Sequence, residues 1–341
     1  MTVDSQQFRN RRIEKLGNHG SGLSAASALL VVPDVAATPQ LLDSLTVDCQ
    51  LLTCHKPMPS NLHFLIIDGY PKPSRDEFDV VGMKHASRLY VEMLKKHLPE
   101  AQHHIWLASD DPAPPEGLGP EHYAGILWPG CNLTIYHDDD QRVTRQIEFA
   151  RKSYEVGTPG FGTCWGIQMA AVGAGGVVSA NPRGREMGFA RKIHLTADGL
   201  GHPMFEGKPT VFNGFTSHLD EITRLPAGGA LLASNDFTHV QAMEVKQGKG
   251  IFWGLAYHPE YDLHEMARLI TARAPKLLAE GFFHSPEALR IYVDKLETLH
   301  QNPSRKDLRW ELDIDDDVLS DQVRQVEFRN WINKVVLRQT R

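Results

Sequence analysis

The chain has 341 residues, with 36 lysines and arginines against 42 aspartates and glutamates and a formal net charge of −6. This slightly acidic balance gives no electrostatic reason to expect nucleic acid or an anionic membrane as a partner. The length exceeds that of one domain of typical size, so a main domain with extensions is expected. The 4 cysteines are too few and too irregularly spaced for a disulfide framework or a zinc site, which favours the reducing cytoplasm.

Residues 1–60 are predicted to form an N-terminal arm of unknown function, irregular apart from one short helix at residues 38–45. Basic residues between Arg9 and Lys15 precede an apolar run, a layout that resembles a signal peptide. The run is short and is cut by Pro33, and no segment approaches the length of a membrane span. We therefore expect neither a targeting segment nor a membrane anchor.

The middle of the chain alternates segments typical of buried strands with segments of helical periodicity. Residues 62–68 form an apolar run that ends at Gly69, as a buried parallel strand should, and residues 83–97 and 141–155 have helical spacing. Further strands are predicted at residues 104–108, 125–128, 211–212, 230–233, 240–245 and 251–256. This alternation predicts an α/β fold, in which a mostly parallel sheet is flanked by helices and functional groups collect at the carboxyl ends of the strands.

The C-terminal stretch, residues 263–341, is predicted to be an all-helical extension. Helices are expected at residues 262–279, at residues 286–300 behind the N-cap Ser285, and at residues 318–337. The last helix carries Trp331 and an apolar stripe of Leu319, Val323, Val326, Ile332 and Val335. Packing of this stripe on the same chain is favoured over a partner-binding arm.

Two short motifs carry the chemistry. Cys164 lies in Gly-Thr-Cys-Trp-Gly-Ile-Gln, which has the form of a nucleophile elbow, where flanking glycines permit a sharp strand-to-helix turn. A helix that begins after Cys164 would favour the thiolate, and the N–H of Trp165 would point at the oxyanion formed on attack. The later motif His-Pro-Glu places His258 and Glu260 on one face of a strand, so that Glu260 can orient the imidazole. Together the motifs favour a reactive thiol over a buried core cysteine.

Five blocks of sequence that include these motifs resemble the class I (triad-type) glutamine amidotransferases, and among them the amidotransferase domains of GMP synthetases and their stand-alone relatives. The blocks are residues 64–68, 125–140, 162–168, 216–220 and 254–260. The elbow and the His-Pro-Glu motif are specific signals, whereas the other blocks are individually weak. The resemblance implies flavodoxin-like layering, a catalytic domain at residues 61–262, a triad of Cys164, His258 and Glu260, and no metal or organic cofactor.

The resemblance also implies which groups bind the substrate. The oxyanion donors are expected from Trp165 and from the loop of Gly130 and Cys131, where this chain has Gly-Cys-Asn in place of the family's Gly-Gly-Pro. A packed side chain is favoured for Cys131 over a second reactive thiol, and Glu186 is a weaker candidate for the pocket wall. The residues implied to contact the substrate are Gln168, Ser217, His218 and Asp220.

The acceptor of the released ammonia stays open, because the chain has neither a Ser-Gly-Gly-x-Asp-Ser loop nor a P-loop. The first hypothesis is a glutaminase that hydrolyses the side-chain amide of L-glutamine through a cysteinyl thioester and supplies a separate synthetase subunit. The second is a self-sufficient γ-glutamyl hydrolase or peptidase. The third is a non-catalytic regulatory protein on the same fold, against which the intact triad argues. A homo-oligomer is compatible with all three.

Overall fold

The computed structural model describes residues 62–339. The predicted N-terminal arm, with its short helix and with Cys49 and Cys54, lies outside the described residues. None of the helices in the described range combines the length and the apolar character needed to cross a membrane.

A nine-stranded sheet lies at the centre, with the order β2-β1-β3-β4-β11-β10-β9-β6-β7. Its strands in chain order are β1 (His63–Asp68), β2 (Gln102–Leu107), β3 (Gly125–Trp128), β4 (Gly160–Thr163), β6 (Glu186–Leu195), β7 (Val211–His218), β9 (Gly229–Ser234), β10 (Ala242–Gln247) and β11 (Gly250–Leu255). Pairing is parallel from β2 to β11 and antiparallel from β11 to β7. A separate antiparallel pair joins β5 (Val177–Ala180) to β8 (Asp220–Arg224).

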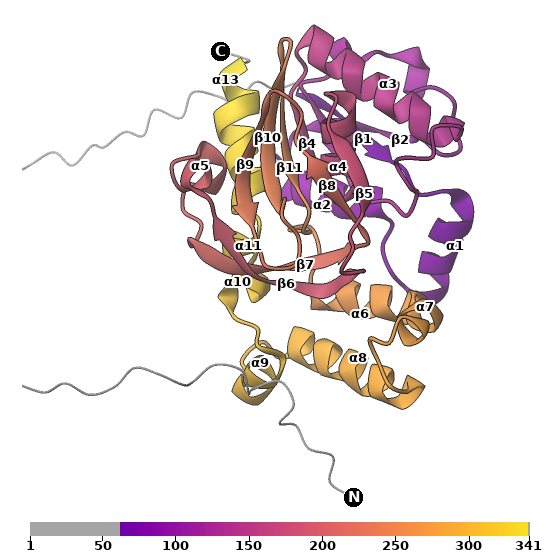
Figure 1. The fold of residues 1–341 in the computed structure, drawn as a ribbon, viewed down its shortest axis with the longest axis vertical. Helices are drawn as coiled ribbons and strands as arrows, with labels where there is room; N and C mark the ends of the chain where they lie inside the picture. The colour runs from indigo at the N-terminus through magenta and orange to yellow at the C-terminus, as the bar shows by residue number, and fades with distance from the viewer. Residues whose placement is uncertain (1–61, 340–341) are drawn as a thin grey trace, which may run out of the picture. The chain divides into compact units, whose positions relative to one another are not determined.

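Helices cover both faces of the parallel half, as the α/β prediction requires (Figure 1). These helices are α2 (Ala86–His97) on one face and α3 (Gln141–Val156) and α4 (Trp165–Gly173) on the other, with α1 (Lys72–Val81) and the short α5 (Ala197–Leu200) at the periphery. Strand β1 shows why its sequence is continuously apolar: Phe64 and Ile66 pack in the cluster of α2, whereas Leu65 and Ile67 pack in that of α3.

The C-terminal region is helical, as predicted. The helix expected at residues 286–300 is confirmed, whereas the other two expected helices are divided into shorter ones. The helices of this region are α6 (Leu263–Ala272), α7 (Ala274–Ala279), α8 (Pro286–Gln301), α9 (Lys306–Leu312), α10 (Asp316–Leu319), α11 (Asp321–Arg324), α12 (Val326–Trp331), the π-helical turn η4 (Ile332–Val336) and α13 (Leu337–Gln339). The prediction of continuous helices at 262–279 and 318–337 was wrong. Arg273 has φ −99° and ψ 11°, and Pro275 in the first turn of α7 lacks the N–H that a continuous helix needs. Ser320 is extended, at φ −90° and ψ 116°.

Part of the apolar stripe of the last helices packs on the central sheet, whereas Leu319 packs in the cluster of α6 to α9 and Val323 is half-buried. Val326, Ile332 and Val335 are buried, and Trp331 lies in the same cluster as residues of β1, β3 and β4. The prediction that this region packs on its own chain is therefore confirmed. Helices α6 to α9 instead join a third cluster with α1 and with Phe189 and Phe215, at the lower edge of the view in Figure 1.

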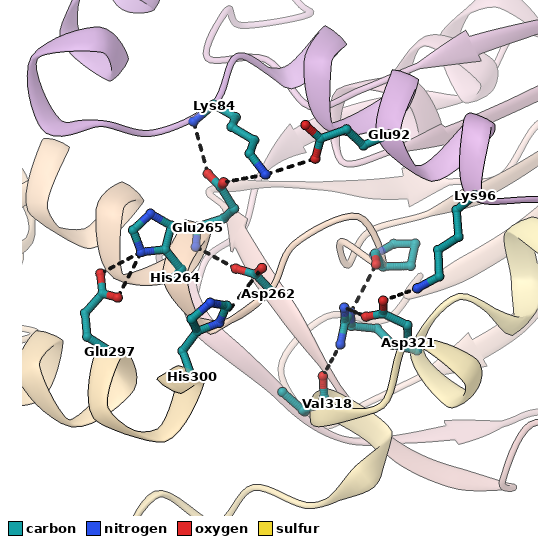
Figure 2. Close-up of polar contacts among 12 residues, drawn as sticks. Lys84, Glu92, Lys96, Asp262, His264, Glu265, Glu297, His300, Val318 and Asp321 are labelled. Atoms are coloured by element: carbon teal, nitrogen blue, oxygen red, sulfur yellow. Dashed lines mark hydrogen bonds and ion pairs between the residues drawn. The ribbon is translucent and has the colours of Figure 1, made fainter. Parts of the chain in front are cut away.

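Polar contacts join α2, α6 and α11 around the segment that follows His258 (Figure 2). Lys84 donates its backbone N–H to Glu265 at 3.1 Å and places its ammonium 3.7 Å from the same carboxylate. Lys96 pairs with Asp321, and Asp262 caps α6 by accepting the backbone N–H of Glu265 at 2.9 Å. Because ion pairs with exposed members contribute little stability, the buried apolar clusters account for most of this packing.

Candidate active site

Cys164 lies between β4 and α4 in a strained backbone conformation, with φ 50° and ψ −94°. Its backbone N–H is held by the carbonyl of Leu255 at 2.8 Å. A Cβ atom at Gly162 would lie 2.7 Å from the carbonyl oxygen of Trp128, and one at Gly166 would lie 2.3 Å from it. Only glycine fits at these two positions, so the elbow packs directly against the end of β3.

A hydrogen-bonded chain leads from His258 back into α2. The Nδ1 of His258 lies 2.6 Å from Oε1 of Glu260. The hydroxyl of Thr163 donates to the same oxygen at 2.9 Å, and the hydroxyl of Tyr90 donates to Thr163 at 2.9 Å. All four side chains are buried, so the carboxylate is held in one orientation and fixes Nδ1–H as the donor of the imidazole.

The other ring nitrogen of His258, Nε2, is available for proton transfer. Nε2 is buried and has no hydrogen-bond partner within residues 62–339. The ring stacks on Tyr261 with centroids 4.3 Å apart and an interplanar angle of 3°. Burial by itself lowers the pKa of His258, but the Glu260 carboxylate and the Cys164 thiol outweigh it and raise the pKa to about 10. The protonated imidazole is therefore favoured beside the thiol.

The loop after β3 closes over these side chains. A Cβ atom on Gly130 would lie 2.9 Å from Cε1 of His258 and 3.6 Å from Cβ of Cys164. The neighbouring Cys131 thiol accepts the backbone N–H of Leu133 at 3.4 Å, and burial raises its pKa. A thiol with a raised pKa is a poor nucleophile, which supports a packing role for Cys131.

A cavity of about 350 Å³ opens beside the thiol. Its walls come from α1, the loop after β3, the start of α4, the end of β7 and the α6–α7 junction. The candidate residues that line it include Cys131, Cys164, Gln168, Ser217, His218 and Asp220. The thiol lies 3.8 Å from the carbonyl oxygen of Ser217. Six of the predicted site residues thus line one cavity, whereas Gly130, Trp165, His258 and Glu260 are not among its lining residues, and the roles of all of them stay predictions.

His218 lies between a carboxylate and a backbone carbonyl. Nε2 lies 3.2 Å from Oε2 of Glu186, and Nδ1 lies 3.1 Å from the carbonyl of Asp220. Glu186 also accepts hydrogen bonds from Asn235 at 2.7 Å and Gln241 at 2.8 Å. Burial would raise the pKa of Glu186, but His218 and these amides lower it. Glu186 therefore positions His218 from behind, and the expectation that it lines the pocket was wrong, since it is not among the cavity-lining residues.

Within the described range, Asp220 is one of two carboxylate residues that line the cavity, the other being Glu77. Its Oδ1 accepts the hydroxyl of Tyr136 at 3.2 Å, and partial burial raises its pKa. Thr163, Tyr90 and Tyr261 are supporting residues that the sequence analysis did not identify. The polar Thr163 in a buried strand beside the nucleophile was a visible signal, whereas the two tyrosines gave none.

The family model for glutamine amidotransferase class-I matches residues 116–274. A gamma-glutamyl-L-1-hydroxyisopropylamide hydrolase from a Pseudomonas species is 33% identical over 286 residues, which cover 81% of this chain and 94% of that protein. The chain belongs to the class I glutamine amidotransferase family. Members of this family are hydrolytic enzymes. The predicted elbow, oxyanion loop and His-Pro-Glu motif of this chain all lie inside the range that the family model matches.

Other proteins similar to this chain are larger than it or share less sequence identity with it. A GMP synthase from Streptomyces avermitilis is 29% identical over 188 residues, which are 55% of this chain and 33% of the synthase. The chain therefore matches only a third of that enzyme. The solved structure of a Thermotoga maritima glutamine amidotransferase superposes with a TM-score of 0.56 at 16% identity, over 81% of this chain and 98% of that one, which shows a shared fold.

Proposed function

We propose that this chain hydrolyses the γ-amide bond of a γ-glutamyl compound through a thioester on Cys164. The observation that carries the proposal is the buried connection from Glu260 to His258 beside a strained cysteine that faces the cavity. In the first step, the thiolate of Cys164, whose proton is held by His258, attacks the amide carbon, and the carbonyl oxygen becomes an oxyanion. The N–H of Trp165 and a backbone N–H of the Gly130–Cys131 loop are the proposed donors to that oxyanion.

Collapse of the tetrahedral intermediate breaks the C–N bond. His258 gives its proton to the leaving nitrogen, so that an amine or ammonia departs and a γ-glutamyl thioester remains on Cys164. His258 then accepts a proton from water, whose oxygen attacks the thioester carbon. The C–S bond breaks, glutamate leaves, and the thiol and imidazole return to their starting state. Glu260 stays ionised throughout and orients the ring.

The leaving group that we favour is a substituted amine, which makes the chain a self-sufficient γ-glutamyl amide hydrolase. Support comes from the Pseudomonas relative, because its name describes such a hydrolase and the similarity extends over 94% of its length. L-glutamine with transfer of ammonia to a separate synthetase is the second candidate. The amidotransferase family and the GMP synthase relatives support it, although those synthases match this chain over a third of their length.

The experiment is steady-state glutamate release by the full chain from L-glutamine and from a series of N-alkyl γ-glutamyl amides. We expect turnover of the N-alkyl amides without any added partner, and a higher kcat/KM for them than for L-glutamine. Cys164→Ala should abolish glutamate release while the melting temperature is kept, and Cys131→Ala is the matched thiol control that should retain most activity. Absence of glutamate release from every amide would refute the proposal, and preference for L-glutamine would favour the second candidate.

A further inference from the structure

Arg273 is a cation on the cavity wall without a counter-ion. It lies at the α6–α7 junction and lines the same cavity as Cys164 and Asp220. Its Nε is buried without a hydrogen-bond partner, and its Nη2 lies 3.4 Å from the hydroxyl of Tyr70. Across residues 62–339, no carboxylate lies within ion-pair distance of this guanidinium.

Other arginines nearby are neutralised by the protein itself. Arg268, on the same helix α6, pairs with Glu297 at 2.7 Å. Arg185, which also lines the cavity, pairs with Glu280 at 2.9 Å. A partly desolvated cation is costly unless an anion compensates it. The missing anion at Arg273 therefore indicates a ligand that supplies a carboxylate.

The backbone holds Arg273 in place. Its N–H donates to the carbonyl of Leu269 at 3.0 Å, and its carbonyl accepts the N–H of Leu277 at 3.0 Å. Leu269 and Leu277 are both buried in the cluster of α6 to α9. The backbone of Arg273 thus belongs to a packed helix junction. Such a rigid position suits a side chain that binds the substrate without taking part in the reaction.

We propose that Arg273 binds the α-carboxylate of the γ-glutamyl group, while the α-ammonium is left to Asp220, which the family resemblance already implies as a substrate contact. This inference rests on the proposed function and names the part of the substrate that the site selects. A guanidinium matches a carboxylate with two parallel hydrogen bonds, and an aspartate is the complementary partner for an ammonium. Arg273, Asp220 and Cys164 all line the same cavity, so one bound molecule can meet a cation, a carboxylate and the thiol. The site therefore selects zwitterionic γ-glutamyl amides over amides that lack the α-carboxylate.

Two truncated substrates with one leaving amine separate the contributions of the charges. A 4-aminobutanamide keeps the ammonium and lacks the carboxylate, whereas a glutaric monoamide keeps the carboxylate and lacks the ammonium. Arg273→Gln should lower kcat/KM about 10- to 100-fold for the γ-glutamyl amide and the glutaric monoamide, mainly through KM, as expected for a hydrogen bond between charged groups. The same variant should not change kcat/KM for the 4-aminobutanamide. Asp220→Asn should give the reciprocal pattern.

The controls separate recognition from folding. Arg268→Gln removes the same charge from α6 outside the cavity. It should not lower kcat/KM for any one of the three substrates more than for the others. Arg273→Lys should recover part of the loss, because it restores the charge without the bidentate geometry. If Arg273→Gln does not fold, as judged by its melting curve, Arg273→Lys carries the same comparison across the three substrates.

Two results would overturn the inference. An equal loss of kcat/KM with all three substrates would mean that Arg273 acts on the thiol or the oxyanion, and an unchanged kcat/KM for the γ-glutamyl amide and the glutaric monoamide would mean that Arg273 does not bind the carboxylate. Calorimetric binding of L-glutamate gives a readout that needs no turnover. Weaker glutamate binding by Arg273→Gln with no hydrolysis of any amide would refute the proposed function alone, whereas unchanged glutamate binding would refute this inference alone.

Discussion

Glu327 of α12 lies in a buried polar network that joins the C-terminal helices to the strand end carrying His258. Its carboxylate lies 3.0 Å from the ammonium of Lys208 and accepts the hydroxyl of Tyr257 at 2.5 Å. The side chains of Lys208 and Glu327 are 1% and 0% exposed. Tyr257 directly precedes His258, so this network supports the candidate base as well as the fold.

Replacing Glu327 with leucine leaves Lys208 buried without its counter-ion. Breaking one partner of a buried ion pair costs about 3–5 kcal/mol. Lys208 retains the carbonyl of Val323 at 2.9 Å, which favours the lower part of that range. For a chain of 341 residues, a loss of about 3–4 kcal/mol corresponds to a melting temperature lower by roughly 4–7 °C.

The loss should also depend on pH with a definite sign. Burial already lowers the pKa of Lys208, and Glu327 is the main group that opposes this effect. Without Glu327 the folded-state pKa falls further below the unfolded value, so folding releases a proton. The destabilisation by Glu327→Leu should therefore be largest near neutral pH and smaller as the pH approaches the unfolded pKa of lysine.

Chemical and thermal unfolding of the full chain tests this reasoning. The double variant Lys208→Met/Glu327→Leu should recover most of the lost stability, because an apolar pair of similar volume replaces a buried ion pair at little cost. Glu311→Leu, which removes one member of the exposed pair with Lys295, is the matched control and should change stability little. A double variant as unstable as the sum of the single variants would refute the argument, as would a Glu327→Leu protein with an unchanged melting temperature.

Four further predictions concern the site and the C-terminal region. Because Glu260 helps to raise the pKa of His258 to about 10, the alkaline limb of kcat/KM should lie near pH 10 and move to lower pH in Glu260→Gln, as a pH–rate profile would reveal; an unmoved limb would contradict this assignment. His258→Ala combined with Glu260→Ala should be little worse than His258→Ala alone, and additive kinetic losses would mean a separate task for Glu260. Gly130→Ala should lower kcat about 100-fold without a change in melting temperature, because the added methyl displaces the His258 ring; full activity would exclude the tight loop. Removal of residues 316–341 should lower the melting temperature or cause aggregation, and a stable truncated chain with unchanged or raised activity would favour a partner surface instead.

The strands β1 and β3 were predictable because both of their faces are buried. Residues 125–128 were predicted as a strand and match β3, and the helix at residues 141–155 matches α3 within one residue. The strand β6 was missed, because a bulge between Ala190 and Ile193, with Lys192 at φ 51°, interrupts the alternation of its side chains. The breaks in the C-terminal helices were missed because single residues with non-helical backbone angles decide them.

The same contrast applies to the site. Cys164, His258 and Glu260 could be predicted because glycine spacing and strand periodicity act over a few residues. Tyr90 reaches Thr163 across 73 positions of the chain, and Arg273 joins the cavity only because α6 and α7 pack beside α1. Contacts of this kind depend on how helices and strands pack together, so they cannot be predicted from local sequence patterns.

The segment that carries His258 is held from two sides, and this explains why the C-terminal helices belong to the machinery of the site. On one side, Thr163 donates to Glu260. On the other, Arg324 donates to the carbonyl of Pro259 at 3.2 Å, and Glu327 accepts the hydroxyl of Tyr257. The backbone on both flanks of His258 is therefore fixed by helices that come more than 60 residues later. A chain that lost these helices would lose the orientation of its candidate base even if the central sheet survived, so stability and turnover should fall together.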